Sequence, residues 1–550
     1  MTKRIISIIL IMVGLTYTVQ AQDTQGFFIN DHQPKKAIVP AHQKIKAITD
    51  LAGVHVTLKL GDSIATMSKY LFGNNTNPYM TQIVNQPALM SQLQLLSPNV
   101  LRFPGGNISN EYFWDKAPGE RPSDVPDTIL FADKRQPRKA RSWVGKDDSP
   151  QSLSLDHYYQ LLQQTNSVGT ICVNAGYARY GTGAHPIANA AHYAAEWVRY
   201  DKGRTRFWEV GNEDYGVWQA GYKIDTHRNR DGQPEITNGQ LYGKIFKAFR
   251  DSMRAAARAI GSEIYVGATL VEMPKNNKWD TEVAQNWNSD FFELAGNAAD
   301  FFVVHSYYTP YNKNADPRTI LNSGTTITDS IIQYLQFVTQ AHHLSLKPVA
   351  LTEWNIFSTG SKQMTSYISG MHAAIVLGEL AKQKYGMACR WDLANGYNNG
   401  NDHGLFNTGD EPGMPKWSAR PAFYYLYYFQ RFFGDKVVAA SADDPNVLVY
   451  ASVFSDGKKG VVLINKDTLA KTVSIHLPDA KPKAQWYAYT LTGGNDNGLF
   501  SQQVWINGIA PSLPAGGPEH FEKIKAQSTE FSDDVKTILP PMAVQYLLIE

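Results

Sequence analysis

Short apolar runs and longer amphipathic segments alternate along the middle of the chain. The runs are rich in Val, Ile and Phe, as buried strands are. Eight of them follow one another: 69–75, 100–106, 170–176, 206–213, 263–270, 300–308, 348–355 and 388–395. Segments with apolar residues at helical spacing lie between them, most clearly 240–261, and also 187–200 and 366–384. Strands that alternate with helices pair in parallel, so eight such units predict a (β/α)8 TIM barrel.

The pattern changes after an aromatic-rich helix predicted over 420–434. The chain beyond it holds short alternating segments with turns between them: "NVLVYASVFS", "KGVVLINK", "TVSIHLP", "QWYAYTLTG" and "AVQYLLIE". Such strands with little helix predict a β-sandwich. An earlier strand, 54–60, alternates in the same way and is expected to join it. The predicted fold class is therefore α/β, a TIM barrel followed by a C-terminal β-sandwich.

The first residues have the pattern of a secretory signal peptide. Lys3 and Arg4 precede an apolar run over 5–15, and "VQA" then offers a small-residue cleavage site after Ala21. The run is too short for a comfortable membrane span. We therefore expect a secreted or periplasmic protein with no membrane span. The polar stretch 22–50 is expected to be loosely ordered.

These patterns divide the chain into four parts. The expected parts are a signal peptide (1–21), an N-terminal extension with a strand that joins the sandwich (22–68), the catalytic barrel (69–434) and the β-sandwich (435–550). The largest insertion in the barrel, 108–154, contains the basic stretch "DKRQPRKARSW". Loops that follow strands build the active site in this fold, so the insertion is expected to shape a substrate cleft. A solvated loop is the alternative for its basic stretch.

Composition narrows the classes of partner. The net charge of +2 gives no electrostatic support for nucleic-acid binding. The 29 Tyr and 12 Trp residues suit surfaces that stack on sugar rings. Cys172 and Cys389 could pair in an exported protein, but we expect two buried apolar side chains on separate strands. Two cysteines without clustered histidines do not make a metal site, so no cofactor or metal is expected.

Two predicted barrel strands end in glutamate. The fourth ends "VGNE" at Glu213, and the seventh contains "LTEWN" with Glu353. Strands four and seven lie on opposite sides of a barrel mouth, so the two carboxylates can face each other across a substrate. Glycoside hydrolysis needs this pair: one carboxyl protonates the leaving oxygen, and the other attacks or activates water. Of the neighbouring acids, we expect Glu209 to be a paired core acid and Asp214 to point toward the loop.

Several motifs together resemble a known enzyme family. They are "LRFPGGN" (101–107), "VNAG" (173–176), "AAEWVRY" (194–200), "WEVGNED" (208–214), "HSYY" (305–308) and "TEWN" (352–355). Their order resembles the clan A retaining glycoside hydrolases, and within them the α-L-arabinofuranosidases of glycoside hydrolase family 51. The resemblance covers about residues 69–395, and a C-terminal sandwich suits that family.

The resemblance implies a retaining double displacement. Glu353 would be the nucleophile and Glu213 the acid/base, and the charge of Glu353 is expected to raise the pKa of Glu213. Asn212 would bind the sugar 2-hydroxyl, and Tyr307 would orient the nucleophile. Arg102 would lie under the nucleophile and keep it ionised, and we group it with the substrate-binding residues.

Four further residues are candidate substrate ligands. His305 lies two positions before Tyr307 and so shares its inward face. Asn107 and Asn174 resemble the family's sugar ligands. Trp391, at the eighth strand, is a candidate stacking platform. Each polar residue could instead be a satisfied core group, and Trp391 could be barrel core.

One departure concerns the sugar. Arabinofuranosidases of this family carry a Glu after the first strand that binds furanose hydroxyls, whereas this chain has "FGNNTNPY", with Asn74, Asn75 and Asn77. The loop 391–406 is also unfamiliar for the family. An endo-acting β-glycanase of the same clan, on plant or algal cell-wall polysaccharide, is therefore an alternative. A non-catalytic carbohydrate-binding barrel and a metal-dependent hydrolase are two others.

Overall fold

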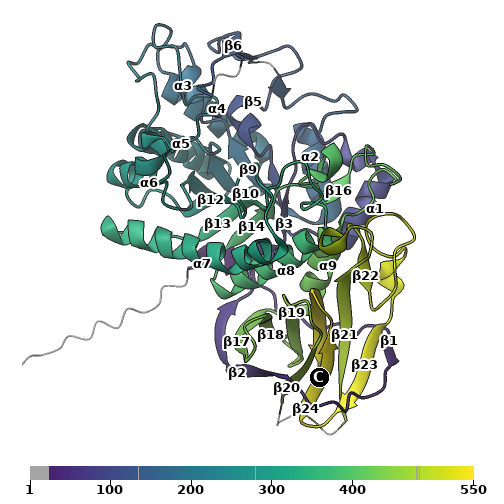
Figure 1. The fold of residues 1–550 in the computed structure, drawn as a ribbon. Coiled ribbons are helices and arrows are strands. Elements are labelled where there is room, and N and C mark those ends of the chain that lie inside the picture. The colour runs from purple at the N-terminus through teal and green to yellow at the C-terminus, as the bar shows by residue number, and fades with distance from the viewer. Residues whose placement is uncertain (1–23, 134–135, 141, 279, 478–480, 482) are drawn as a thin grey trace, which may run out of the picture.

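The middle of the chain folds into a closed barrel of parallel strands with helices outside it (Figure 1). The computed structural model describes residues 24–550 except 134–135, 141, 279, 478–480 and 482. The signal peptide predicted over 1–21 lies outside these residues. No helix in the described part of the chain is long and apolar enough to cross a membrane.

The barrel strands follow chain order around the ring. Among the described residues they number eight: β3 (Gly73–Asn75), β4 (Val100–Phe103), β9 (Val168–Val173), β10 (Thr205–Val210), β11 (Tyr265–Thr269), β12 (Phe301–Tyr307), β13 (Val349–Asn355) and β14 (Met387–Arg390). Each overlaps one of the predicted apolar runs, and β14 pairs with β3 to close the ring. The predicted TIM barrel is confirmed. The runs were recognisable because nearly all of their side chains are buried.

Helices connect the strands on the outside of the barrel. The main ones are α1 (Pro87–Leu96), α2 (Leu155–Thr165), α4 (Pro186–Asp201), α5 (Gly239–Ala259), α6 (Glu282–Ala295), α7 (Pro317–Ala341), α8 (Tyr367–Lys382) and α9 (Pro421–Phe432). Several begin at side-chain caps. The Asn238 side chain accepts from the Leu241 N–H at the start of α5, and Thr281 accepts from the Ala284 N–H at the start of α6.

The C-terminal domain is a mixed sheet that curls around its own apolar core. In the described residues it has 11 strands: β1 (His42–Lys44), β2 (Val54–Thr66), β17 (Lys436–Ala442), β18 (Val447–Val453), β19 (Lys459–Asn465), β20 (Lys471–His476), β21 (Ala484–Gly493), β22 (Val504–Ile506), β23 (Ala526–Phe531), β24 (Asp534–Leu539) and β25 (Ala543–Ile549). The five predicted C-terminal segments correspond to β18, β19, β20, β21 and β25. A continuous sheet replaces two separate facing sheets because β2 pairs with both β17 and β20.

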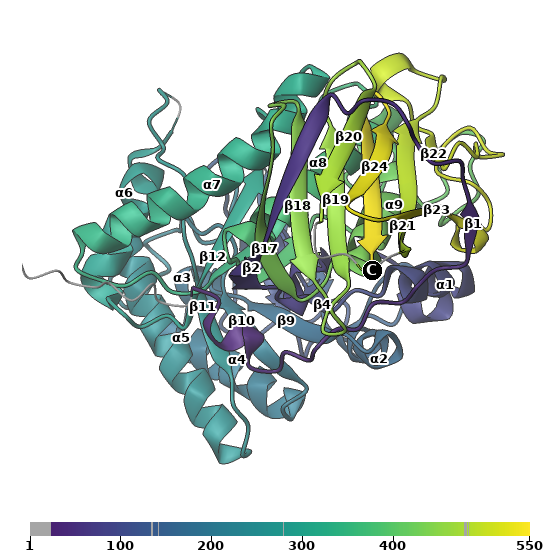
Figure 2. The same ribbon diagram turned by 90° about the horizontal axis from the view of Figure 1, so that it is seen from below.

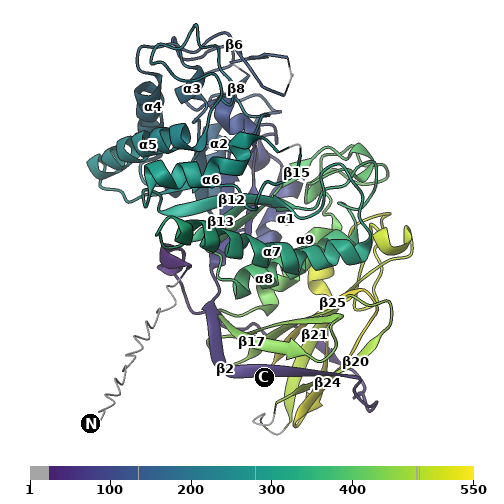
Figure 3. The same cartoon turned by 60° about the vertical axis from the view of Figure 1, so that its left-hand side comes forward.

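The sheet packs against the barrel through α8 and α9 (Figures 1 and 3). The Tyr450 hydroxyl on β18 donates to Glu379 Oε1 on α8 at 2.9 Å. The Tyr546 hydroxyl on β25 donates to the Tyr425 carbonyl on α9, also at 2.9 Å. All four residues are buried, so the two domains share one apolar interior.

The N-terminal extension closes the floor of the barrel, although the sequence analysis expected 22–50 to be loosely ordered. A short 3-10 helix, η1 (Gly26–Ile29), carries Phe28, which is 1% exposed. Its ring lies 5.0 Å from Phe207 and 5.4 Å from Phe301, near the starts of β10 and β12. Figure 2 looks toward this end of the molecule, with the purple segment beside β10. Two consecutive aromatic residues, "FF", override the polar average of the segment.

The insertion at 108–154 lies at the end of the barrel remote from the sheet domain (Figure 1). It starts with the 3-10 helix η4 (Asn107–Glu111) and continues as two small pairs, β5 (Tyr112–Phe113) with β8 (Trp143–Val144) and β6 (Thr128–Ile129) with β7 (Arg138–Lys139). Arg138 from the basic stretch donates to Glu111 Oε1 at 2.9 Å. Part of that stretch therefore has a local structural partner.

Candidate active site

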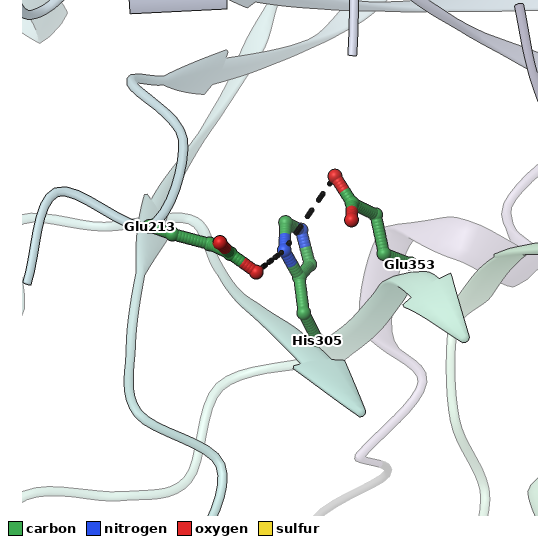
Figure 4. A group of neighbouring side chains, drawn as sticks. All are labelled: Glu213, His305 and Glu353. Carbon is green, nitrogen blue, oxygen red and sulfur yellow. Dashed lines mark hydrogen bonds and ion pairs between the residues drawn. The ribbon is translucent and has the colours of Figure 1, made fainter. Parts of the chain in front are cut away.

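Two glutamates and a histidine meet at the carboxyl ends of the barrel strands. Glu353 lies on β13, His305 lies on β12, and Glu213 follows β10. Figure 4 shows the His305 ring between the two carboxylates. One oxygen of each carboxylate and one ring nitrogen all lie within 4.8 Å of one another. Strand order thus brings together two acids, Glu213 and Glu353, that are 140 residues apart in the sequence.

Glu353 is held by three fixed donors. Arg102 Nη1 donates to Oε1 at 2.8 Å, and the Gly106 N–H donates to the same oxygen at 3.2 Å. The Tyr307 hydroxyl donates to Oε2 at 2.9 Å. The side chain is only 5% exposed. These contacts fix the carboxylate in one orientation at the mouth of the barrel.

Arg102 lies beneath this carboxylate and is itself fully buried. Its Nε donates to Glu209 Oε2 at 2.9 Å, and its Nη2 donates to Asn212 Oδ1 at 2.9 Å. Arg102 is therefore a positioning group without access to substrate, which corrects its assignment as a substrate ligand. Glu209 is a buried ion-pair partner. Asn75 Oδ1 accepts from Arg102 Nη1 at 3.1 Å, a role that the sequence analysis missed.

Glu213 sits on a sharp turn at the end of β10. Its φ of +47° and the +77° of Gly211 are both left-handed, a conformation that costs a non-glycine residue ~1–3 kcal/mol. His305 Nδ1 lies 2.9 Å from Oε1, and Trp218 Nε1 donates to Oε2 at 2.7 Å. The side chain is 16% exposed, more than that of Glu353. The turn thus presents the carboxyl to the open side of the site.

The pKa of Glu213 is shifted in the direction opposite to the expectation. Burial raises it, but the hydrogen bond and charge of His305, followed by the Trp218 N–H, bring the pKa below its usual range. The pKa of His305 is raised: burial lowers it, and the charges of Glu353 and Glu213 outweigh that effect. The histidine that lowers the pKa of Glu213 comes from another strand. Because Glu213 and His305 are in contact at 2.9 Å, they titrate as a coupled pair.

His305 makes its second contact behind the site. Its Nε2 lies 3.2 Å from the Thr352 hydroxyl, which can donate or accept. The ring is therefore held in both its neutral and its protonated form. His305 contacts Glu213 directly, so its position fits proton sharing with the acid better than sugar binding.

The sequence analysis expected Asp214 to point toward the loop, but the side chain points into the protein. It is 9% exposed, and its carboxylate accepts from Asn110 Nδ2 at 3.2 Å and from the Thr269 hydroxyl at 3.4 Å. Burial raises its pKa to about 7. Asn110 also donates to the Asn212 carbonyl at 3.0 Å. The turn that carries Glu213 is thus tied to the first residues of the insertion.

Of the other predicted sugar ligands, Asn174 is committed elsewhere. Its amide donates to the Tyr112 carbonyl and to the Tyr180 hydroxyl, and its oxygen accepts from the Tyr177 N–H. It therefore shapes a loop, because both ends of its amide are taken. Asn107, at the start of η4, is half-buried beside the site.

Asn212 and Trp391 keep groups that a sugar could reach. Arg102 occupies Asn212 Oδ1, which leaves the amide Nδ2 as the group for a sugar hydroxyl. The Trp391 ring is half-exposed and lies against Gly106, where an added Cβ would come within 2.6 Å of Trp391 Cη2. Gly106 therefore lets the backbone reach both Glu353 and the indole.

Glu213, His305 and Glu353 are also spaced as metal ligands could be. However, Arg102 Nη1 already lies 2.8 Å from Glu353 Oε1. A metal cation there would be placed beside a buried guanidinium, which is electrostatically unfavourable. The cluster therefore fits a pair of working carboxyls better than a metal centre. The two cysteines, both described, are free and buried, on β9 and β14.

Trp218 is the main functional candidate that the sequence analysis missed. It is 37% exposed and lies five positions after Glu213 in the same loop. An exposed indole whose N–H donates to the Glu213 carboxyl also offers a ring face to a sugar. The signal was the aromatic-rich "YGVW" directly after the strand-end glutamate.

No family model matches the chain. An intracellular exo-alpha-(1->5)-L-arabinofuranosidase of Acetivibrio thermocellus is 22% identical over 275 residues, which is 48% of this chain. The match spans about half, 47%, of that relative's length. A probable alpha-L-arabinofuranosidase C of Aspergillus terreus is 20% identical over 76% of this chain and 83% of its own length.

Solved structures share the whole architecture. A family 51 arabinofuranosidase from Xanthomonas axonopodis pv. citri has a TM-score of 0.62 at 15% identity and covers 91% of this chain and 100% of its own. A family 44 xyloglucanase from Paenibacillus polymyxa has a TM-score of 0.56 at 13% identity, with 90% and 99% covered. The chain is thus a distant relative of α-L-arabinofuranosidases with the family 51 fold, which confirms the predicted resemblance.

Proposed function

We propose that the chain is an exported, retaining α-L-arabinofuranosidase that acts on arabinose-containing cell-wall polysaccharide. The observation that carries the proposal is the pair of carboxyls from β10 and β13, with oxygens within 4.8 Å of each other. Retaining enzymes hold their two carboxyl groups about 5–5.5 Å apart, whereas inverting enzymes need about 6.5–9.5 Å to admit a water. The short spacing of the two carboxyls supports the retaining arrangement.

In the first step, Glu353 attacks the anomeric carbon of the sugar. Arg102, Gly106 and Tyr307 hold its carboxylate in place for the attack. Glu213 gives a proton to the glycosidic oxygen as the bond to the leaving group breaks. The product is a glycosyl ester on Glu353, and the leaving sugar departs as an alcohol.

In the second step, Glu213 acts as a base. It takes a proton from a water molecule, which attacks the anomeric carbon and releases the sugar and the free Glu353 carboxylate. The proton then held on the Glu213–His305 pair serves the next cycle. Asn212 Nδ2 supports both steps as a donor to the 2-hydroxyl, a contact that strengthens in the transition state.

The similarity to enzymes named as arabinofuranosidases supports the choice of sugar. The N-terminal pattern of Lys3, Arg4 and the apolar run 5–15 supports export. This differs from the Acetivibrio relative, which is named as intracellular. N-terminal sequencing of the mature protein would test export, with a start at residue 22 as the expected result.

An endo-acting β-glycanase is the second candidate, and Asn75 favours it. The amide of Asn75 donates to the Thr352 carbonyl at 2.8 Å, and its oxygen accepts from Arg102. Asn75, at the end of the first barrel strand, therefore offers furanose hydroxyls neither a carboxylate nor a free amide. The family 44 xyloglucanase with the same architecture is consistent with this alternative.

The deciding experiment compares substrates and product stereochemistry. Purified protein is incubated with p-nitrophenyl α-L-arabinofuranoside and with arabinan, xyloglucan, xylan and β-glucan, and product sizes are resolved. Proton NMR of the first product should show the α-anomer, since double displacement retains configuration. Release of arabinose supports the first candidate, and internal cuts in a glucan or xylan support the second. Failure to cleave any glycoside would exclude both.

A further inference from the structure

A cavity of about 540 Å³ opens beside the nucleophile, between the loops that follow β13 and β14. Phe357 lines it from the first loop. The second loop supplies the polar residues of the lining: Asn395, Asn398, Asn401, His403 and Asp410. The volume lies in the range of about 300–1,000 Å³ that small-molecule sites occupy.

The cavity is bounded by residues that contact the catalytic centre through Tyr307. The hydroxyl of Tyr307 donates to Glu353, and its ring lies 4.5 Å from the Phe357 ring and 5.3 Å from the His403 ring. Phe357 and His403 both line the cavity. Tyr307 and these two rings therefore connect the cavity to the nucleophile.

The lining has the chemistry of a neutral sugar site. Asparagine side chains both donate to and accept from hydroxyl groups, and aromatic faces cover the apolar faces of sugar rings. The Phe357 ring is half-exposed and is extended by Tyr311, which lies 4.8 Å away and is 69% exposed. Within the described part of the chain, the Asn401 side chain is held by one long hydrogen bond, which its oxygen accepts from the Ser358 hydroxyl at 3.5 Å.

Charge in the cavity argues against an acidic ligand. Neither Lys nor Arg is among the described residues that line it, and Asp410 contributes a carboxylate. Burial and the nearby Arg390 lower the pKa of His403 to about 3, so its ring is neutral at pH 7. A uronic acid or a phosphate would find no Lys or Arg among the described lining residues, whereas an uncharged sugar meets hydrogen-bonding groups beside the apolar side chains Phe357 and Met364.

The loop that forms the cavity is anchored from behind. Arg420 pairs with Asp402 and donates to Glu411 Oε2 at 3.2 Å, and Asp402 Oδ1 accepts from the Gly404 N–H at 2.7 Å. Arg390 Nη1 donates to the His403 carbonyl at 2.9 Å. A preformed wall loses little entropy when a ligand binds.

We propose that this cavity is a binding subsite for an uncharged sugar unit next to the one that is cleaved. It makes the protein more active on an oligosaccharide than on a glycoside with a single sugar. The inference rests on the proposed function, because it assigns a second sugar to the same active site. It also gives a role to the unfamiliar loop 391–406.

Asn401→Trp and Asn401→Ala test the subsite. The first fills the cavity and the second removes one amide, and neither touches Glu213, Glu353 or their contacts. Asn446→Trp and Asn446→Ala, on the turn between β17 and β18 of the sheet domain, are the matched controls. For each protein, kcat/KM is measured on p-nitrophenyl α-L-arabinofuranoside and on arabinobiose and arabinotriose.

Asn401→Trp is expected to lower kcat/KM on the oligosaccharides at least tenfold. The kcat/KM on the aryl glycoside should stay within about twofold of wild type. The reason is that loss of a subsite removes binding energy that only the longer substrates use. Asn401→Ala should lie between it and the wild type. Equal losses on both substrates, or no loss on either, would overturn the subsite and leave the proposed function intact. A wild-type protein that cleaves none of these substrates would overturn both. Retained aryl-glycoside activity shows that each variant is folded.

Discussion

The two carboxyls that we propose as catalytic have different surroundings, although their oxygens lie within 4.8 Å of each other. Glu353 is held by a guanidinium, a backbone N–H and a tyrosine hydroxyl, groups that keep their protons at neutral pH. Glu213 faces His305, a titratable group whose pKa is raised by the two carboxylates, and the indole of Trp218. The groups around Glu353 favour its charged form, whereas His305 beside Glu213 can exchange a proton with it. This difference supports the proposed roles of Glu353 as nucleophile and Glu213 as acid/base without reference to a relative.

The largest effect is expected at the fixed carboxylate. Glu353→Gln removes the attacking oxygen but keeps the shape, so kcat should fall on the order of 10⁴-fold or more on every substrate. The measurement is steady-state hydrolysis of p-nitrophenyl α-L-arabinofuranoside. Glu293→Gln, at an exposed position on α6, is the control with unchanged activity. Glu353→Gln activity within tenfold of wild type would exclude Glu353 as the nucleophile.

A smaller, substrate-dependent effect is expected at the other carboxyl. Glu213→Gln removes the proton donor, which is worth about 10²–10⁴-fold when the leaving group needs protonation. Arabinobiose should therefore lose much more rate than the p-nitrophenyl glycoside, whose leaving group is acidic. Rate ratios for the two substrates measure the difference. Identical losses on both would contradict the acid/base role.

His305→Asn tests whether the proton is shared. The wild-type pair retains its last proton to a higher pH because the pKa of His305 is raised. Without the imidazole, Glu213 alone must hold that proton, so the alkaline limb of kcat/KM should move to lower pH. A pH–rate profile from pH 4 to 9 gives the limb directly. A lower rate with an unmoved limb would mean that His305 only fills space.

The smallest effect is expected for Trp218→Phe. This change keeps a ring face but removes the N–H that donates to Glu213 Oε2, and a hydrogen bond of this kind contributes about 1 kcal/mol, or roughly fivefold. The donor favours the ionised carboxylate, so its loss should raise the pKa of Glu213. Comparison of kcat/KM and the pH profile with wild type checks both. Fluorescence of the remaining tryptophans reports folding.

Much of the barrel was predictable because its strands are buried on both faces and read as continuous apolar runs. The sheet domain was less so: β23, "AQSTEF", and β24, "DVKTIL", have half-exposed side chains and weaker patterns. The floor of the barrel was missed, since Phe27 and Phe28 stand alone in a polar segment. Local composition does not reveal which distant strands two phenylalanines will cover.

The site shows the same limit. Glu213 and Glu353 could be found because each ends or lies on a strand, and strand order fixes their side of the barrel. The lowered pKa of Glu213 could not be predicted, because the His305 ring that contacts Glu213 comes from β12. Likewise, the length and polarity of Asn174 suit a sugar ligand, but tyrosines that follow it in the chain take its amide. Contacts between elements, rather than residue types, decide these cases.

The strand β2 has a consequence for how the molecule can be divided. It pairs with β17 on one side and β20 on the other, and the same N-terminal extension carries Phe28 into the barrel floor. A protein that lacks the residues before 69 would lose β2, the strand that connects β17 to β20, and would also expose Phe207 and Phe301. The barrel and the sheet domain are therefore not interchangeable modules that can be expressed apart or fused elsewhere. Because one N-terminal segment packs into both, we expect its removal to destabilise both domains.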